Sequence, residues 1–285
     1  MSGRFCAGRA APVGRGGGYI HRRVNAWRGS SGHIVVEPAE SVAVIRLDRA
    51  DKLNALSVPM LADLRDALVT YGSGGTSAAL VLTGSGRAFS AGDDLPATES
   101  LEEEDFETLL SSFQDLTRAI LRSDVPVIAA LNGIAVGGAA ELTLACDARV
   151  GHAGSDYLFP ENDVGLTISN ASTYLLPRLV GSRALPLVLD GRRIGGAEAH
   201  ALGLIDHFVD DPGDVLPRAL EVARRWVERG LATRYHLKLL RPPLDEVEAA
   251  IERENAIGRE AFRAGTAQAG IKRFLQEQEA RRSRR

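Results

Sequence analysis

The chain has 285 residues, a net charge of −3, 45% hydrophobic residues and 25% charged residues. This balance is typical of a globular protein and excludes collagen-like and disordered chains. With only two cysteines, Cys6 and Cys146, neither a disulfide framework nor a Cys-based zinc site is expected, and a reducing cytoplasm fits. The longest weakly polar stretch, 125–140, is shorter than the ~20 apolar residues that cross a bilayer, so no membrane partner is expected.

Residues 1–33 form a separate compositional segment with six arginines, eight glycines and no acidic residue. The net charge therefore divides into +6 for this segment and −9 for the remainder, and an acidic body argues against a nucleic-acid partner. The segment shows almost no apolar periodicity, and we predict that it is disordered. An Arg-rich start without acids also fits a targeting peptide, but the chain contains 31 Arg and three Lys, so Arg is its ordinary cation and a plain tail is favoured.

Hydrophobic periodicity and turn residues predict an alternation of strands and helices after residue 33. A helix is expected after Ser57, a second one opens at Glu102, and the chain ends in long charged helices. This order indicates the α/β class. The expected strands are 34–36, 42–47, 78–83, 127–131, 148–150 and 157–159, and the expected helices include 57–72, 102–122, 139–146, 244–263 and 267–282.

A glycine pair, Gly137-Gly138, stands where the strand near 130 passes into a helix. Glycine allows positive φ and a close approach of a ligand, and a free N–H at a helix start stabilises developing negative charge. Gly138 is thus a candidate oxyanion donor, with a simple tight turn as the alternative. Glu141 follows among alanines and leucines, and it is either an exposed first-turn residue or a buried general acid or base.

A second strand-to-loop passage ends in Ser90-Ala91-Gly92-Asp93-Asp94 and can expose a backbone N–H at Ala91. With Gly86 and Ala88 it nearly matches the Gly-x-Ser-x-Gly nucleophile elbow, which would make Ser90 a hydrolase nucleophile. Asp190 or Asp206 with His207 could complete a triad, but such residues occur by chance in most chains of this length. No dinucleotide-binding, Walker or His-Glu-x-x-His pattern is present, so no cofactor and no metal are expected.

Taken in order, these segments resemble the enoyl-CoA hydratase/isomerase (crotonase) family over residues 34–282. The resemblance rests on Leu53-Asn54-Ala55-Leu56-Ser57, Ala91-Gly92-Asp93-Asp94-Leu95, Val136-Gly137-Gly138-Ala139-Ala140-Glu141, Leu175-Leu176-Pro177-Arg178-Leu179-Val180-Gly181 and Gly203-Leu204-Ile205-Asp206. It implies a core spiral of ββα units over 34–230, followed by a helical trimerisation region over 231–285. A homotrimer or a dimer of trimers is implied as well.

The resemblance also implies an acyl-CoA thioester as substrate, with coenzyme A as part of the substrate and no separate cofactor. Its carbonyl would be polarised by the N–H groups of Ala91 and Gly138. The residues implied to contact CoA or substrate are Leu53, Asn54, Ala55, Ala91, Gly92, Asp93, Asp94 and Gly138.

Hydratases of this family use two glutamates, and Glu141 and Glu161 stand at the matching positions. Alone, Glu161 would be interpreted as a loop carboxylate. Isomerases of the family usually lack the acid that matches Glu141, so the resemblance implies syn addition of water to a 2-enoyl-CoA, with Glu141 activating the water and Glu161 supplying the α-carbon proton.

Residues 164–174 depart from the Pro-Gly-rich pattern that hydratases show after the second glutamate. We expect this segment to enter a helix beside the acyl pocket, capped by Ser169 or Asn170. The departure leaves acyl specificity open. It also keeps alternatives in view, namely double-bond isomerisation, thioester or C–C hydrolysis, and a non-catalytic binding protein with the same fold.

Overall fold

The computed structural model describes residues 24–94 and 102–282, with side chains up to residue 276. A seven-stranded sheet in the order β1-β2-β3-β4-β6-β8-β10 forms its centre, and a three-stranded sheet in the order β5-β7-β9 lies beside it. The first three strands of the large sheet pair antiparallel and all the others pair parallel. The large sheet contains β1 (Trp27–Arg28), β2 (Ile34–Ala39), β3 (Val42–Leu47), β4 (Ala79–Gly84), β6 (Val127–Ala130), β8 (Ala148–Gly151) and β10 (His207–Phe208), and the small sheet contains β5 (Ala88–Ser90), β7 (Ile134–Val136) and β9 (Tyr157–Leu158).

The chain passes from the large sheet to the small sheet and then into a helix, three times in succession. The three turns are β4-β5-α3, β6-β7-α4 and β8-β9-α5, with α3 at Glu103–Arg122, α4 at Gly138–Leu144 and α5 at Ser172–Val180. Each strand therefore pairs with the corresponding strand of the next turn, as β4 pairs with β6 and β5 with β7. This arrangement confirms the predicted spiral of ββα units.

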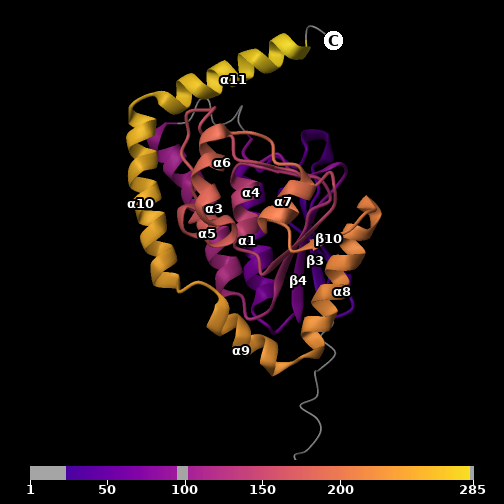
Figure 1. Cartoon of the computed structure of the whole chain (residues 1–285). Coiled ribbons are helices and arrows are strands. Elements are labelled where there is room, and N and C mark those ends of the chain that lie inside the picture. Colours follow the sequence, from indigo (N-terminus) through magenta and orange to yellow (C-terminus); the bar gives the residue numbers. More distant parts are fainter. Residues whose placement is uncertain (1–23, 95–101, 283–285) are drawn as a thin grey trace, which may run out of the picture.

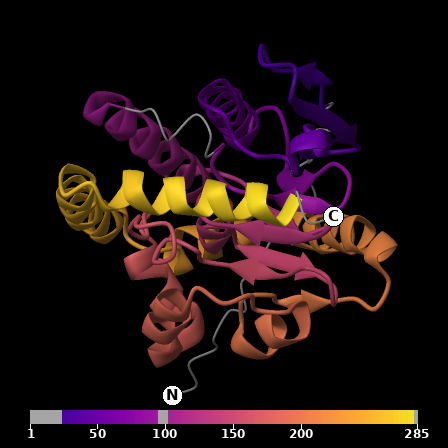
Figure 2. The same cartoon turned by 90° about the horizontal axis from the view of Figure 1, so that it is seen from above.

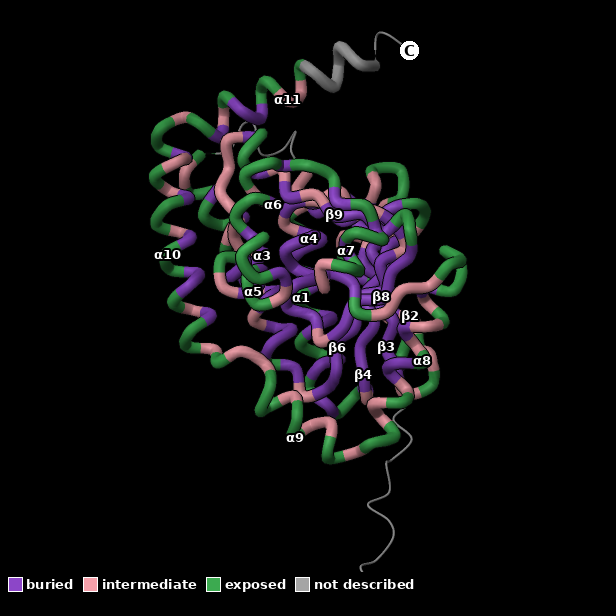
Figure 3. The backbone as a smooth tube through the Cα atoms, viewed as in Figure 1, coloured by how far each residue is buried: buried purple, intermediate pink, exposed green. Residues whose placement is uncertain are grey.

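Alternation of apolar residues along the strands fills two hydrophobic layers. On β3, Ala43 and Ile45 face the main core under α1 (Val58–Gly72), α3 and α4, whereas Val42 and Val44 face α8 (Val215–Glu228). The strands of the large sheet run through the purple, buried interior of Figure 3. Because both faces of the sheet are covered, its parallel strands can be apolar on both sides.

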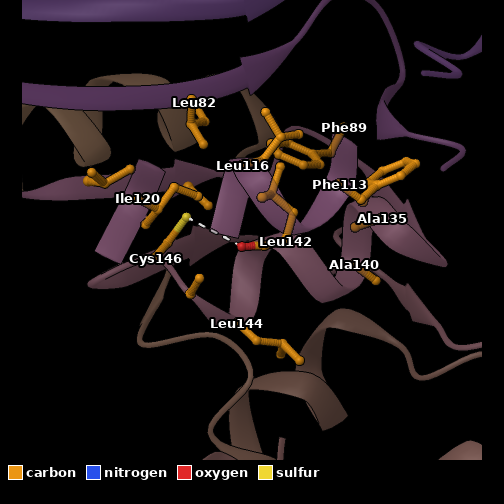
Figure 4. Close-up of a cluster of buried hydrophobic side chains, with 14 of the residues drawn as sticks. Leu82, Phe89, Phe113, Leu116, Ile120, Ala135, Ala140, Leu142, Leu144 and Cys146 are labelled. Carbon is orange, nitrogen blue, oxygen red and sulfur yellow. Dashed lines mark hydrogen bonds between the residues drawn. The ribbon is translucent and has the colours of Figure 1, made fainter. Parts of the chain in front are cut away.

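Helix α4 lies inside this core because nearly all of its side chains are apolar. Leu142 lies beside Leu116 in the close-up of Figure 4, and Leu144 points to the opposite side of the helix, where it is also part of the core. Cys146, just beyond the helix, is buried there, and its thiol contacts the Leu142 carbonyl at 4.0 Å. Burial raises the pKa of Cys146 to about 12, so the thiol is inert. The only charged side chain that this helix carries into the interior is that of Glu141.

The last helices run around the outside of the core: α9 (Leu231–Leu240) lies at the bottom of Figure 1, α10 (Leu244–Arg263) along one side and α11 (Thr266–Arg282) across the top. Seen from above, α11 crosses the molecule (Figure 2), and Thr266 Oγ1 donates to the Gly165 carbonyl at 3.1 Å. The predicted helices 244–263 and 267–282 are confirmed. Their trimerising role stays a prediction. The remaining described helices are α6 (Ala184–Asp190) and α7 (Gly196–Leu202), with short 3₁₀ turns at Ala50–Lys52, Gly181–Arg183 and Pro212–Asp214.

The end of the predicted disordered segment is ordered. Residues 24–33 include β1, which pairs with β2, and the buried Val24. The N–H groups of Ser30 and Ser31 donate to the Asp63 carboxylate at 3.0 and 2.7 Å, which fixes this segment to α1. The predicted boundary at residue 34 was therefore wrong by ten residues, and residues 1–23 lie outside the described part. Among the described helices, none has the length and apolar character needed to span a membrane.

Candidate active site

The turn between β7 and α4 is built from two glycines with different tasks. Gly137 has φ 53° and ψ −132°, a conformation that favours glycine, and its carbonyl accepts from the Glu141 N–H at 2.9 Å. Gly138 is the first residue of α4. A Cβ placed there would lie 2.8 Å from Phe113 Cε1, so a larger residue does not fit. Within the described residues the Gly138 N–H has no hydrogen-bond acceptor, and it remains open to a ligand.

The neighbouring loop, residues 91–94, corrects one predicted donor. The Ala91 N–H donates to the Leu53 carbonyl at 2.9 Å, so Ala91 is not available for an oxyanion. The Asp93 N–H has no acceptor within the described part of the chain. Asp93 also lies beside the glycine turn, since its Oδ1 is 3.1 Å from the position that a Gly138 Cβ would take. The backbone pair open to a ligand is therefore Asp93 and Gly138.

The predicted CoA-contacting segment 53–55 is tightly connected to this loop. The Asn54 side chain is fully buried, accepts from the Arg49 N–H at 2.9 Å, and donates to the carbonyls of Ser85 and Ala88 at 2.9 Å each. Its predicted contact with CoA is wrong for the side chain, because a long-range network uses the whole amide. Arg49 Nη1 bonds the Ala55 carbonyl at 3.1 Å and Asp94 Oδ2 at 2.9 Å, joining the two loops.

Of the remaining residues predicted to bind CoA or substrate, Ala55 and Gly92 are buried, and Leu53, Ala91, Asp93 and Asp94 are partly exposed. Gly92 has φ 79°, and a Cβ there would meet the Val136 carbonyl at 2.5 Å, so the loop can lie against the end of β7 only with glycine. The Ser90 hydroxyl is buried and donates to the Asn54 carbonyl at 2.8 Å. A buried hydroxyl held by a backbone carbonyl does not form the predicted nucleophile elbow.

Glu141 is buried at 1% exposure, with hydrogen bonds to both carboxylate oxygens. Its Oε1 accepts from the Ser169 N–H at 2.9 Å. Its Oε2 accepts from Ser169 Oγ and Asn170 Nδ2 at 2.8 Å each. Ser169 and Asn170 were predicted to cap α5, and this is wrong: the N-cap is Ala171, and both residues hold Glu141 instead.

Glu161 follows β9 and is also buried, at 6% exposure. Its Oε1 is 3.4 Å from the position that a Gly137 Cβ would take, so the carboxyl lies at the glycine turn. Its Oε2 is buried and has no hydrogen-bond partner among the described residues. The structure thus brings Glu141, Glu161, Gly138 and the 91–94 loop together, whereas His207 lies on β10 of the large sheet.

Burial dominates the electrostatics of this site. Burial and the charge of Glu161 raise the pKa of Glu141 well above 4.5, although the Ser169 hydrogen bonds act in the opposite direction. Burial, reinforced by the charge of Asp93, raises the pKa of Glu161 to about 8. Burial also raises the pKa of Asp93 to about 7. Carboxyls tuned toward neutral pH are suited to general acid–base chemistry.

A further carboxylate, which the sequence analysis missed, supports the Glu141 side of the site. Glu254 of α10 accepts from the N–H groups of Ala171 and Thr173 at 2.8 Å each and from Thr173 Oγ1 at 2.6 Å. It therefore fixes the start of α5, directly after Ser169 and Asn170. The available signal was its place in the buried stripe of α10, which contains Val247, Ala250, Ile251, Glu254 and Gly258.

No cluster of three or more His, Cys, Asp or Glu side chains able to hold a metal occurs in the part of the chain that the structure describes. The described part of the site offers the backbone N–H groups of Asp93 and Gly138 and the acidic side chains of Asp93, Glu141 and Glu161.

Comparison with known proteins identifies the family. A model of the enoyl-CoA hydratase/isomerase family matches residues 37–282. This chain belongs to the enoyl-CoA hydratase/isomerase family. It is 31% identical over 233 residues to a crotonyl-CoA hydratase of Syntrophomonas wolfei, covering 81% of this chain and 88% of that protein. It is also 34% identical over 203 residues to a 4-chlorobenzoyl coenzyme A dehalogenase of an Arthrobacter species, covering 69% of this chain and 72% of that one.

The fold agrees with solved structures of the same family. The crystal structure of an enoyl-CoA hydratase from Bacillus halodurans superposes with a TM-score of 0.78 at 23% identity, covering 84% of this chain and 99% of that chain. As a member of this family, the chain is a crotonase-fold enzyme of acyl-CoA thioesters. Since relatives of similar identity carry both hydratase and dehalogenase names, family membership alone leaves the reaction open.

Proposed function

We propose that this protein is an enoyl-CoA hydratase that adds water syn across the double bond of a 2-enoyl-CoA thioester. The observation that carries the proposal is the meeting of two buried carboxyls, Glu141 and Glu161, at the turn that presents the Gly138 N–H. Addition of water needs one group to remove a proton and one to supply a proton, and this pair provides both at one place.

The thioester carbonyl oxygen accepts hydrogen bonds from the N–H groups of Asp93 and Gly138. These donors are fixed before the reaction, so they stabilise the enolate-like charge that develops on the oxygen. Glu141 takes a proton from the water as its oxygen bonds to the β carbon, and Glu161 gives its proton to the α carbon. One water is added in total. Glu141 is then protonated and Glu161 is deprotonated, and proton exchange with solvent restores both carboxyls before the next turnover.

The hydrogen-bond partners support this division of labour. Glu141 accepts three hydrogen bonds, which favours its charged form and therefore its action as a base. Glu161 leaves one buried oxygen without a donor, which favours its protonated form and its action as an acid.

The test is incubation of the purified protein with crotonyl-CoA, following the ultraviolet absorbance of the enoyl thioester and the product mass. Loss of absorbance with gain of one water is the expected result. Unchanged crotonyl-CoA, together with turnover of a 3-enoyl-CoA or of an aryl-CoA, would replace hydration by another reaction of the family.

We also propose that this chain assembles with copies of itself. The exposed face of α9 carries Leu231, Tyr235, Leu239 and Leu240, with 60–76% of each residue exposed. Several large apolar side chains exposed on one helix are typical of an interface. We expect other copies of this chain to cover it in a homotrimer or a dimer of trimers. Light scattering should give three or six times the chain mass of 30.4 kDa.

A further inference from the structure

The C-terminal helix α11 lies directly against the turn that carries Glu161. A Cβ on Gly270 of the helix would lie 2.2 Å from the Val164 carbonyl oxygen. On the other side of the contact, a Cβ on Gly165 of the turn would lie 2.1 Å from the Thr266 carbonyl oxygen. No side chain fits at such distances, so helix and turn meet backbone to backbone, which glycine permits at both positions.

Two hydrogen bonds from the helix fasten the same contact. Thr266 Oγ1 donates to the Gly165 carbonyl at 3.1 Å, and Arg273 Nη2 donates to the Asp163 carbonyl at 2.7 Å. Both acceptors are backbone carbonyls of the turn. The helix therefore fixes the course of the main chain there rather than the direction of one side chain.

The turn connects this contact to Glu161 through its own hydrogen bonds. The Leu166 N–H donates to the Glu161 carbonyl at 2.9 Å. The N–H groups of Asp163 and Val164 donate to the Pro160 carbonyl at 2.9 and 3.1 Å. These bonds close the turn into one unit, so a shift of its far side moves the Glu161 backbone with it.

The Glu161 carboxyl follows the backbone of its turn. It is hydrogen-bonded to the backbone of Glu161 itself, and its Oε2 has no hydrogen-bond partner among the described residues. Glu141 differs, because Ser169 and Asn170 donate to both of its oxygens. The position of the Glu161 carboxyl therefore depends on what holds the turn.

We propose that α11 is the positioning element of Glu161, and that Gly270 and Arg273 are its positioning residues. The two C-terminal helices then divide the site between them. Helix α10 fixes the Glu141 side through Glu254 and the start of α5, and α11 fixes the Glu161 side through the turn.

The effect on catalysis rests on the proposed hydratase function, in which Glu161 supplies a proton to the α carbon. Gly270→Ala must move the helix and the turn apart by about 1 Å to reach an ordinary carbon–oxygen contact. A displacement of about 1 Å at a reacting group costs on the order of 10²-fold in rate. We therefore expect kcat for crotonyl-CoA to fall by about 10–10²-fold, with little change in KM.

The pH profile should change as well. Burial raises the pKa of Glu161 to about 8, and hydration needs its protonated form. A carboxyl that moves toward water loses part of this shift. The pH above which hydration declines should therefore be lower in Gly270→Ala than in the wild type.

The experiment uses the full chain, with Gly258→Ala of α10 as the matched glycine control. A Cβ on Gly258 would meet Thr167 Oγ1 at 3.4 Å and Leu110 Cδ1 at 3.7 Å, which are ordinary contacts. The first readout is hydrogen exchange of the backbone amides of residues 160–166, measured by mass spectrometry, and it needs no turnover. The second is kcat, KM and the pH profile with crotonyl-CoA.

A second variant keeps the test valid if Gly270→Ala does not fold. The double variant Thr266→Val, Arg273→Ala removes both hydrogen bonds to the turn and introduces no overlap. Its control is Lys272→Ala, which removes an exposed cation from the neighbouring position.

In Gly270→Ala and in the double variant we expect faster exchange of residues 160–166 and a lower kcat, with wild-type behaviour in both controls. Unchanged exchange overturns the proposal, because α11 would then not hold the turn. Faster exchange with wild-type kcat also overturns it, because Glu161 would then not depend on the turn. A lower kcat with an equally raised KM and an unmoved pH profile would show a general loss of structure, and would overturn it too.

Failure of the hydratase function gives a different result. A wild-type protein that leaves crotonyl-CoA unchanged would remove that function. Faster exchange of residues 160–166 in Gly270→Ala, but not in Gly258→Ala, would still show that α11 holds the turn of Glu161.

Discussion

Glu141 and Glu161 are equally buried, yet their surroundings are opposite. Glu141 receives three hydrogen bonds from Ser169 and Asn170, whereas one buried carboxylate oxygen of Glu161 has no hydrogen-bond partner among the described residues. Burial raises the pKa of both groups, so burial cannot distinguish their roles. The donors do, because three donors stabilise the anion of Glu141, whereas a buried oxygen of Glu161 has no donor and favours the protonated acid.

The contrast between the two glutamates extends to the segments that hold them in place. The segment that holds Glu141 is itself held by Glu254, whose carboxylate accepts the N–H groups at the start of α5. No described residue plays the same part for the free oxygen of Glu161. Glu141 is thus held by two successive sets of contacts, whereas the free oxygen of Glu161 is left to the substrate.

The largest effect is expected on turnover. Glu161→Gln and Glu141→Gln should each lower kcat for crotonyl-CoA by about 10²–10⁴-fold, the usual contribution of a general acid or base. The check is steady-state hydration monitored by absorbance. Near-wild-type turnover in either variant would show that the glutamate takes no part in proton transfer.

The second expected effect concerns Glu254, which holds the start of α5 next to Ser169 and Asn170. Glu254→Ala removes the acceptor of two N–H groups and one hydroxyl, and should lower the free energy of unfolding by roughly 1–3 kcal/mol. It should also lower kcat more than it raises KM, since it displaces the segment that fixes the base rather than a group that binds CoA. Denaturant titration and steady-state kinetics measure the two effects.

The control for Glu254 is Glu252→Ala, an exposed position on the same helix. It should leave both quantities unchanged. Equal losses in the two variants would mean that α10 responds to any change of charge, and that Glu254 has no special part in fixing α5.

How much of this the sequence could predict depends on the range of the interactions. The helix 244–263 and the strands β2 and β3 were predicted because their periodicities are local. The two-residue strand β1 was missed because it is set by pairing with β2 and by Asp63 of α1, not by its own Arg- and Gly-rich sequence.

The range of the interactions also separates the site features that the sequence predicts from those that it does not. The glycine turn at Gly138 and the spacing of Glu141 and Glu161 are visible in the chain. The free N–H of the 91–94 loop was assigned to Ala91 because nothing local shows that the Leu53 carbonyl occupies it. Ser169 and Asn170 have the composition of helix caps, and only the fold reveals that Glu141 lies opposite them.

The third expected effect is a difference in the free energy of unfolding between Glu141→Gln and Glu161→Gln. In Glu141→Gln, the new NH₂ group faces a donor at Ser169 or Asn170, and we expect a loss of roughly 1–3 kcal/mol. In Glu161→Gln no donor is opposed, so no such loss is expected. Thermal or denaturant unfolding at pH 6 makes this comparison, and equal losses would contradict it.

The pH dependence sharpens the same comparison. The folded-state pKa of Glu161, about 8, lies above its ordinary 4.5, so its contribution to stability is complete below about pH 4.5 and is lost as the pH rises through 8. Glu161→Gln should therefore become more stable relative to the wild type between pH 6 and pH 9. A constant difference over that range would show that Glu161 ionises normally in the folded protein.

The smallest effect is expected from one of the three bonds to Glu141. Ser169→Ala removes the hydroxyl donor but keeps the backbone N–H, so it should cost about 0.5–1.5 kcal/mol of stability and lower kcat only a few-fold. Ser172→Ala is the matched control, because the Ser172 hydroxyl is buried in the same segment without a partner among the described residues. Removing an unpaired buried hydroxyl should be neutral or slightly stabilising. If both serines behaved alike, the hydroxyl of Ser169 would be filling space rather than holding the base. The contrast between the two carboxyls would then rest on the backbone N–H and Asn170 alone.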